Sequence, residues 1–305
     1  MNAIELRHGA WSARIAVSSG ANCVSLCHSG YGMHILREPP EAGERDNPYL
    51  YGMPLLFPVN RISGGKFVFE GREYRFPINE PQTGCHLHGD LHDAPFAVTE
   101  VGEGRLCCSL TRGARAGFPH AFRLDVTYTL AEAGLVQEVR VYNLSDRNMP
   151  CLLGLHTTFD LSREADVCAH ADVGVLIERD ESYLPTGRFP AEDEITRALN
   201  ASDFRTKEIF VSRHYRAAGQ GGMGLYFPKR GLRMRYETDE KFGFRLIYNG
   251  GSDAYICLEP QSCAVDAANA SYPAPLARIP FVPPHDSLCF TSKITLEKEN
   301  RNEDH

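Results

Sequence analysis

The sequence predicts a mainly β fold, specifically a large antiparallel β-sandwich with a few short helices. Apolar and polar residues alternate repeatedly with a period of two, which is typical of half-buried strands. The 27 Gly and 19 Pro residues are spread along the whole chain, as expected where turns join many short elements. Sustained helical periodicity is scarce. Many short strands with few helices favour an antiparallel sandwich or barrel.

The strand signals run from one end of the chain to the other. A hairpin is expected at residues 67–78, where two alternating runs flank a link that contains Gly71. Apolar residues from Leu124 to Leu130 share one face, and the pattern resumes at Val139 after a turn at 132–134. The other strand candidates are residues 14–17, 223–227, 232–236, 244–248, 254–258 and 292–296. Short helices are expected at 192–199 and around 203–210.

The 305 residues are expected to form a single domain, 1–305, although the length alone permits one or two. No low-complexity segment separates two halves. Residues 297–305 are almost wholly polar and charged. We therefore expect this last segment to be a frayed tail.

Composition and charge exclude several classes of function. The 32 basic and 39 acidic residues give a net charge of −7, which provides no positive field for nucleic acid. No apolar run is long enough to cross a membrane. Charged residues interrupt the N-terminal 17 residues, so a signal peptide is not expected. These features predict a cytoplasmic protein that binds neither nucleic acid nor membrane, as a monomer or a homodimer.

The ten cysteines include no C-x-x-C pair and have mostly apolar neighbours. We expect them to be reduced, buried side chains that form neither disulfides nor a metal cluster.

A histidine-rich segment stands out at Cys85-His86-Leu87-His88-Gly89-Asp90-Leu91-His92. On a strand, His86 and His88 would project from the same face. Such a pair can begin a cupin-like metal site with His92, but H-x-H spacing is a weak signal, and a hydrogen-bonded structural histidine is the simpler interpretation.

Three other polar positions adjoin apolar runs. His156 follows Cys151-Leu152-Leu153 and precedes two threonines, which fits either a site residue or a buried structural histidine. Glu259 closes the apolar run 255–258 ahead of Pro260, a residue that cannot continue a central ladder. This predicts a carboxylate at a strand end, either in a cleft or in a salt bridge. Arg61 follows Asn60 and can bind a substrate oxygen or brace a loop.

In their order along the chain, these segments resemble the aldose 1-epimerase (galactose mutarotase) family. The resemblance spans about 210 residues and is carried by Pro58-x-Asn60-Arg61-Ile62-x-x-Gly65-x-Phe67, Gly71-x-x-Tyr74, Asn79, Leu87-His88-Gly89, His156-x-x-Phe159-x-Leu161, Leu184-Pro185-Thr186-Gly187, Leu258-Glu259-Pro260-Gln261 and Asp266-Ala267-x-Asn269. Each motif is weak alone, but the ordered set is specific.

The resemblance implies a large mutarotase-like β-sandwich that interconverts the α and β anomers of a small-molecule sugar without a metal or cofactor. It places Glu259 as the general base, His156 as the general acid, and His88 and Arg61 at substrate-binding positions. Asn60, His86, Gln261 and Arg213 complete the expected substrate-binding set. Of these, His86 is not part of the shared core, and it lines the cleft beside His88 or faces the other way if a bulge intervenes. We also expect proximity of the acid and the base to lower the pKa of Glu259 and raise that of His156.

One part of the family pattern is missing between Gly187 and Arg233. The family's sugar-binding Asp has no clean counterpart, and Arg213 stands about where it is expected. An acidic or phosphorylated sugar is therefore an alternative, with Arg61, Arg213 and Arg216 as ligands; a solvated basic loop is the simpler interpretation. The competing functions are a hexose-6-phosphate 1-epimerase, a non-catalytic sugar-binding protein and a metal-dependent cupin-like enzyme.

Overall fold

The computed structural model describes residues 3–40, 47–207, 209–219 and 222–299. Nearly all regular structure in these ranges is β-strand, and every strand pair is antiparallel. The only α-helix among them is α1, Glu194–Asn200. The mainly β fold class is confirmed.

The largest sheet has nine strands in the order β10-β11-β12-β13-β26-β22-β21-β17-β19. Its strands are β10 (Ala97–Gly102), β11 (Arg105–Arg112), β12 (Phe122–Ala131), β13 (Gly134–Asn143), β17 (Cys168–Ala171), β19 (Phe204–Arg205), β21 (Met223–Phe227), β22 (Leu232–Thr238) and β26 (Ser287–Lys298). The long C-terminal strand lies at the centre of this sheet, where Phe290 pairs with Val139.

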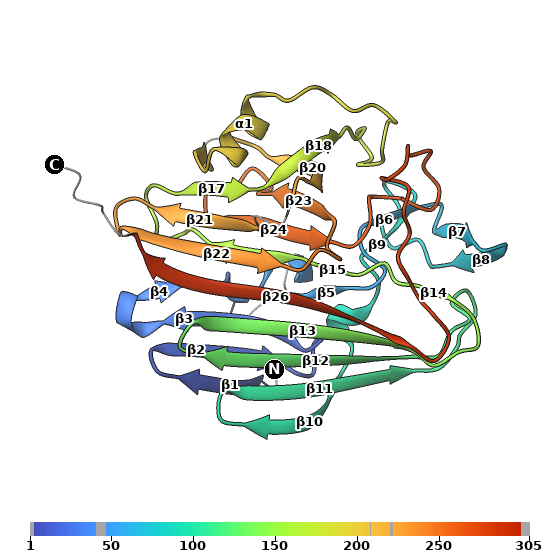
Figure 1. Ribbon diagram of the computed structural model, residues 1–305, viewed down its shortest axis with the longest axis horizontal. Helices are drawn as coiled ribbons and strands as arrows, with labels where there is room; N and C mark the ends of the chain where they lie inside the picture. Colours follow the sequence, from blue (N-terminus) through green and yellow to red (C-terminus); the bar gives the residue numbers. More distant parts are fainter. Residues whose placement is uncertain (1–2, 41–46, 208, 220–221, 300–305) are drawn as a thin grey trace.

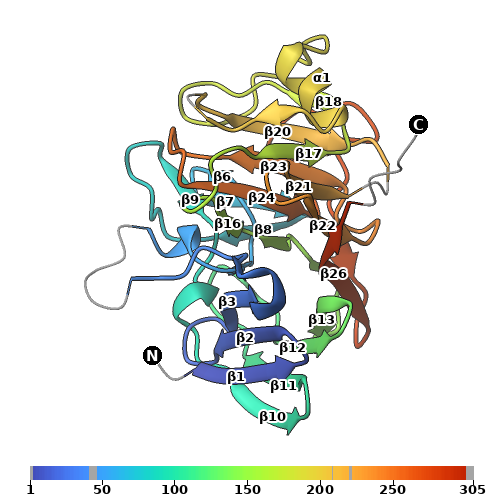
Figure 2. The same ribbon diagram turned by 90° about the vertical axis from the view of Figure 1, so that its left-hand side faces the viewer.

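A seven-stranded and a four-stranded sheet lie against this large sheet (Figures 1 and 2). The former has the order β18-β20-β23-β24-β15-β5, with β16 also pairing β24. Its strands are β5 (Leu55–Leu56), β15 (Gly154–Leu155), β16 (Thr157–Asp160), β18 (Val173–Ile177), β20 (Ser212–Ala217), β23 (Phe244–Tyr248) and β24 (Tyr255–Gln261). The four-stranded sheet consists of β1 (Ala3–His8), β2 (Trp11–Ala16), β3 (Asn22–His28) and β4 (Met33–His34).

Short elements complete the described part of the chain. The two-stranded sheets pair β6 (Arg61–Ser63) with β9 (Cys85–Leu87), β7 (Lys66–Phe69) with β8 (Arg72–Arg75), and β14 (Met149–Pro150) with β25 (Phe281–Val282). The 3₁₀ helices are η1 (Ser29–Tyr31), η2 (Pro48–Leu50) and η3 (Leu91–Asp93). None of the described helices has the length and apolar character to span a membrane.

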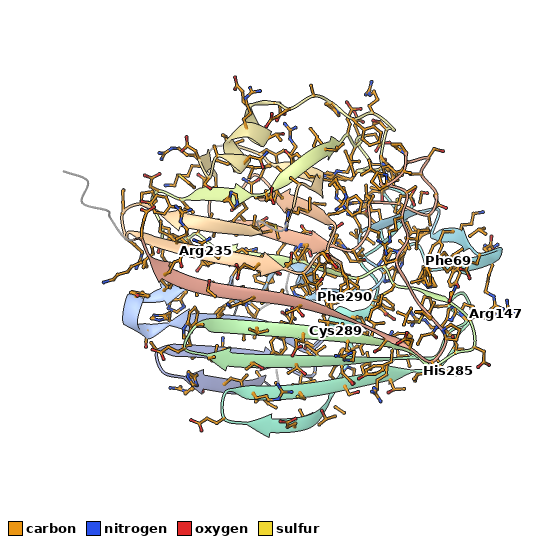
Figure 3. The ribbon with its side chains drawn as sticks, in the orientation of Figure 1. Phe69, Arg147, Arg235, His285, Cys289 and Phe290 are labelled. Carbon is orange, nitrogen blue, oxygen red and sulfur yellow. The ribbon has the colours of Figure 1, made fainter. Side chains whose placement is uncertain are left out.

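The core lies between the layers and draws apolar side chains from all three large sheets. Alternation along β26 shows how one strand serves both sides. Phe290 is buried in the core, whereas its neighbour Cys289 is only partly buried (Figure 3). The same alternation buries Leu124, Val126 and Tyr128 on β12, as their spacing predicts. All ten cysteines are free thiols.

The predicted hairpin is present as β7 and β8. Its two turn residues, Glu70 and Gly71, have φ angles of 48° and 74°. Two consecutive positive φ angles match the twist of the flanking strands, which explains the glycine in the link. The second strand ends at Arg75, three residues earlier than the alternation suggests.

Two local expectations are wrong, and a third, the start of the tail, is wrong in part. Residues 203–210 do not form a second helix in their described part, because Phe204 is buried and β19 pairs with β17. β24 does not end at Glu259 but continues through Pro260 to Gln261. The segment expected to be a tail begins inside β26, which runs to Lys298, and residues 300–305 lie outside the described ranges.

Candidate active site

A cavity of about 260 Å³ opens where β6 and β9 meet the β20-β23-β24 region of the seven-stranded sheet. Both ribbon views place β6 and β9 beside this sheet (Figures 1 and 2). Five residues expected from the sequence line the cavity: Asn60, Arg61, His88, His156 and Glu259. This volume corresponds to about nine liquid waters. It is large enough for one monosaccharide.

The register of two strands places His156 opposite Glu259. Thr157 pairs with Leu258, and Gly154 pairs with Gln261, so His156 and Glu259 occupy facing positions between these pairs. The ladder is interrupted here because Pro260 has no N–H to donate. His156 Nε2 lies 3.3 Å from Glu259 Oε1, and the side chains are 7% and 1% exposed.

Burial dominates the protonation of this pair. It raises the pKa of Glu259 to about 8, against smaller lowering effects from Gln261, Arg179 and Arg61. Burial also lowers the pKa of His156 to about 4. Our expectation from proximity was therefore wrong in both directions, because loss of hydration disfavours each charged form more than attraction favours it. Between about pH 4 and 8 the pair carries one proton.

A buried amide pair orients the carboxylate. Gln261 Nε2 donates to Glu259 Oε2 at 3.2 Å, and Gln261 Oε1 accepts from Asn60 Nδ2 at 2.9 Å. Gln261 is fully buried and does not line the cavity. Its position supports Glu259 and Asn60 through hydrogen bonds.

His88 projects into the cavity from a strained stretch of backbone. Its φ is 61°, and that of Asn60 is 62°; the His88 N–H donates to the Asn60 carbonyl, and the Asn60 N–H donates to His88 Nδ1. The next residue, Gly89, passes so close to Phe57 that a Cβ would lie 2.2 Å from its carbonyl oxygen. Burial holds the pKa of His88 well below its usual value.

Arg61 forms a bidentate ion pair with Glu80, in which Nε and Nη2 each donate at 2.6 Å. The strand that carries it is fixed at its other end, because Ser63 donates to both carboxylate oxygens of Asp266. Asn269 also donates to Asp266. The Asp266-Ala267-x-Asn269 motif therefore anchors β6 beneath the cavity.

Besides Gln261, two more of the expected substrate-binding residues do not line the cavity. His86 does not line the cavity: it contacts the Pro77 carbonyl through Nδ1 at 2.8 Å and stacks on Phe76. The positive φ of His88 breaks the strand alternation that would have placed both histidines on one face. Arg213 points to the opposite side of β20 from Ser212 and pairs with Asp193 at 2.7 Å.

The geometry also bears on the cupin-like alternative. Among the described residues, two groups of three potential metal ligands lie close together: Cys27, His34 and Glu38, and His156, Cys257 and Glu259. The expected triad of His86, His88 and His92 is not one of them, and His92 instead contacts Tyr49 and Asp93.

Sequence reasoning missed several lining residues. Arg179 reaches the cavity and donates to Ser212 Oγ at 2.8 Å. Tyr183 contributes its ring, with the Arg61 guanidinium 4.5 Å from the ring centroid, and Tyr49 and Tyr248 are two further aromatic walls. Arg179 lies in a charged stretch typical of a solvated loop. Its only sequence signal is the nearby Leu184–Gly187 motif.

Comparisons with known proteins identify the family of the chain. The family model described as aldose 1-epimerase matches residues 2–277. An uncharacterized protein of Escherichia coli (strain K12), YihR, is 28% identical over 279 residues, which cover 88% of this chain and 86% of YihR. The galactose mutarotase of Rattus norvegicus is 31% identical over 140 residues, or 42% of this chain and 39% of that protein.

Among solved structures, a galactose mutarotase-like protein from Clostridium acetobutylicum superposes with a TM-score of 0.90 at 24% identity, covering 97% of this chain and 95% of that one. A likeness at this identity shows a common fold. The family-model match covers most of the sequence, and the chain belongs to the aldose 1-epimerase family.

Proposed function

We propose that this protein is a cofactor-independent aldose 1-epimerase, an isomerase that interconverts the α and β anomers of an aldose by opening and reclosing its ring. One observation carries the proposal: His156 and Glu259 face each other at 3.3 Å in the wall of a cavity sized for one sugar. A binding protein needs no such matched acid and base, so catalysis explains the pair better than recognition alone.

Ring opening needs two proton transfers on one bound sugar. Glu259 accepts the proton of the C1 hydroxyl, and His156 donates a proton to the ring oxygen as the C1–O5 bond breaks. In the resulting aldehyde, rotation about C1–C2 presents the other carbonyl face. Attack by the O5 hydroxyl, with both protons returned, gives the other anomer. Each positioned acid or base contributes about 10²–10⁴ to the rate.

The one-proton state of the pair suits this cycle. A neutral His156 beside a protonated Glu259 holds as many protons as a charged His156 beside an ionised Glu259. Moving that proton between them prepares the acid and the base without exchange with solvent. The hydrogen bond from Gln261 then favours the ionised carboxylate.

The remaining wall supplies recognition. Arg61, held by Glu80, and His88 present donors toward the cavity for the sugar oxygens. Tyr49 lies 4.8 Å from the His88 ring centroid and 6.2 Å from that of His156. Its ring offers an apolar surface to the sugar C–H groups.

Optical rotation of freshly dissolved α-anomers tests the proposal across a panel of aldoses. We expect at least one sugar to be accelerated and Glu259→Gln to lower kcat by about 10²–10⁴. The matched control is Glu297→Gln. This carboxylate pairs with the exposed Arg235 of β22 (Figure 3), and neither residue lines the cavity. If no sugar is accelerated, the enzymatic proposal is wrong. If Glu259→Gln matches wild type, the site assignment is wrong.

A further inference from the structure

Arg179 is the one arginine of the cavity that forms no ion pair with a described carboxylate. Arg61 also lines the cavity, but Glu80 binds it through two hydrogen bonds of 2.6 Å. In residues 3–40, 47–207, 209–219 and 222–299, no Asp or Glu forms an ion pair with Arg179. Its recorded contacts there are Ser212 Oγ and the Tyr183 ring, whose centroid lies 5.5 Å from the guanidinium carbon.

The other charges of the cavity cancel. Its lining carboxylates are Glu80, which Arg61 neutralises, and Glu259, which shares one proton with His156. Arg179 therefore leaves a net charge of about +1 in a partly enclosed site at neutral pH. Burial, and then the charge of Arg61, lower the pKa of Arg179 to about 10, so the group stays charged. A cation in such surroundings is stabilised by a bound anion.

The register places Arg179 and Glu259 on different strands, where their charges act on each other without forming an ion pair. Ile177 pairs with His214 in antiparallel register, so Arg179, two residues further on, lies opposite Ser212. Ser212 pairs with Tyr248 on the next strand. Tyr248 in turn pairs with Cys257, so Ser212 and Glu259 lie two strands and two residues apart, or about 12 Å between their backbones. This separation accommodates a pyranose ring whose C1 lies at Glu259 and whose far end approaches Arg179.

We propose that the substrate is an aldose with an anionic group remote from C1, a carboxylate, sulfonate, sulfate or phosphate, and that Arg179 binds this group. The inference deepens the proposed function and rests on it. The structure gives Arg179 one hydrogen bond, from Nη2, which leaves N–H groups for a second, bidentate contact with two anion oxygens. A neutral sugar would leave the charge unbalanced.

The test compares sugars that differ only at C6. Anomerisation of glucose, glucuronate, 6-deoxy-6-sulfoglucose, glucose 6-sulfate and glucose 6-phosphate is followed by exchange NMR at equal ionic strength. We expect one acidic sugar to exceed glucose in kcat/KM by about 10- to 100-fold, and the best of the four identifies the anion. Raising the salt concentration should reduce this preference.

Variants of Arg179 tie the preference to this residue. Arg179→Gln should abolish the preference in kcat/KM for the acidic sugar over glucose by raising the KM of the acidic sugar. Arg179→Lys should retain part of this preference. The matched control is Arg213→Gln, because Arg213 pairs with Asp193 outside the cavity. Thermal melts show whether each variant is folded, and titration calorimetry with the acidic sugars measures binding apart from turnover.

The outcomes separate the two proposals. If glucose is accelerated at least as well as every acidic analogue, the inference is wrong while the epimerase proposal stands. If no sugar is accelerated but an acidic sugar binds in an Arg179-dependent way, the epimerase proposal fails and anion recognition stands. An acidic preference that survives Arg179→Gln also refutes the assignment.

Discussion

Replacing Glu259 by Gln should make the protein more stable, and the gain should grow with pH. Glu259 is 1% exposed, and burial raises its pKa from 4.5 to about 8. As pH rises through this window, the unfolded chain releases the proton while the native protein holds it. Stability is therefore lost between pH 4.5 and 8. A glutamine cannot ionise, and it keeps an acceptor for Gln261 and a donor for His156.

The magnitude is clearest above pH 6.5. Below that value His156, whose native pKa is about 4, contributes the opposite slope, because its unfolded form takes up a proton that the native form does not bind. The two slopes cancel between about pH 4.5 and 6.5. From pH 6.5 to 8.5 the carboxyl alone lowers the wild-type free energy of unfolding relative to Glu259→Gln by about 2 kcal/mol.

Urea denaturation of both proteins at pH 6.5 and 8.5, fitted with one common m-value, measures how much the difference in their free energies of unfolding changes with pH. The other buried histidines with lowered pKa values are His86, His88, His120 and His214. Both proteins contain them, so their contributions cancel in the comparison. Parallel stability curves for the two proteins would refute the reasoning. They would mean that native Glu259 ionises near its ordinary pKa, as half of a salt bridge with His156.

Three further predictions concern activity and stability. The pH dependence of kcat/KM should be bell-shaped with limbs near 4 and 8, where the His156–Glu259 pair gains a second proton or loses its only one; an activity that still rises well above pH 8 would contradict the pair. Glu80→Gln should raise KM about tenfold, since it removes the bidentate anchor of Arg61, and an unchanged KM in steady-state assays would show that this anchor is dispensable. Gly71→Ala should cost about 1 kcal/mol in urea denaturation without altering kcat, because its φ of 74° is strained for alanine although its surroundings are open; a stability equal to wild type would refute the turn assignment.

Alternation in the sequence located most strands but not their partners. The runs 223–227 and 244–248 became β21 and β23 without change, because each buries alternate or successive apolar residues in the core. The pairing of β26 with β13 and β22 joins segments far apart in the sequence, and no local sequence pattern predicts it. The failure at 203–210 has the same origin, since pairing of Phe204 with Ala169 overrides any local helical preference.

The sequence predicted the main polar residues of the site but not the arginine and tyrosine side chains that form the rest of the cavity wall. Ordered motifs singled out His156, Glu259 and Arg61, which the structure gathers around one cavity. Of the misplaced residues, His86 was chosen by its strand spacing from His88, and Arg213 because it stands about where the family's Asp is expected. A positive φ at His88 reverses one assignment, and the other depends on which face of a strand turns toward the cavity.

The position of Pro260 connects fold to chemistry. Proline was expected to end the strand, yet β24 continues because Pro260 still pairs with Arg245 of β23 on one side. On its other side the missing N–H coincides with the gap between β15 and β16. His156 lies in this gap. The strand register on either side places it opposite Glu259, but the backbone of His156 is not itself part of the ladder. A residue with an N–H at position 260 would favour a continuous ladder through His156. We infer that the interruption of the ladder at Pro260 helps to place the His156 and Glu259 side chains opposite each other.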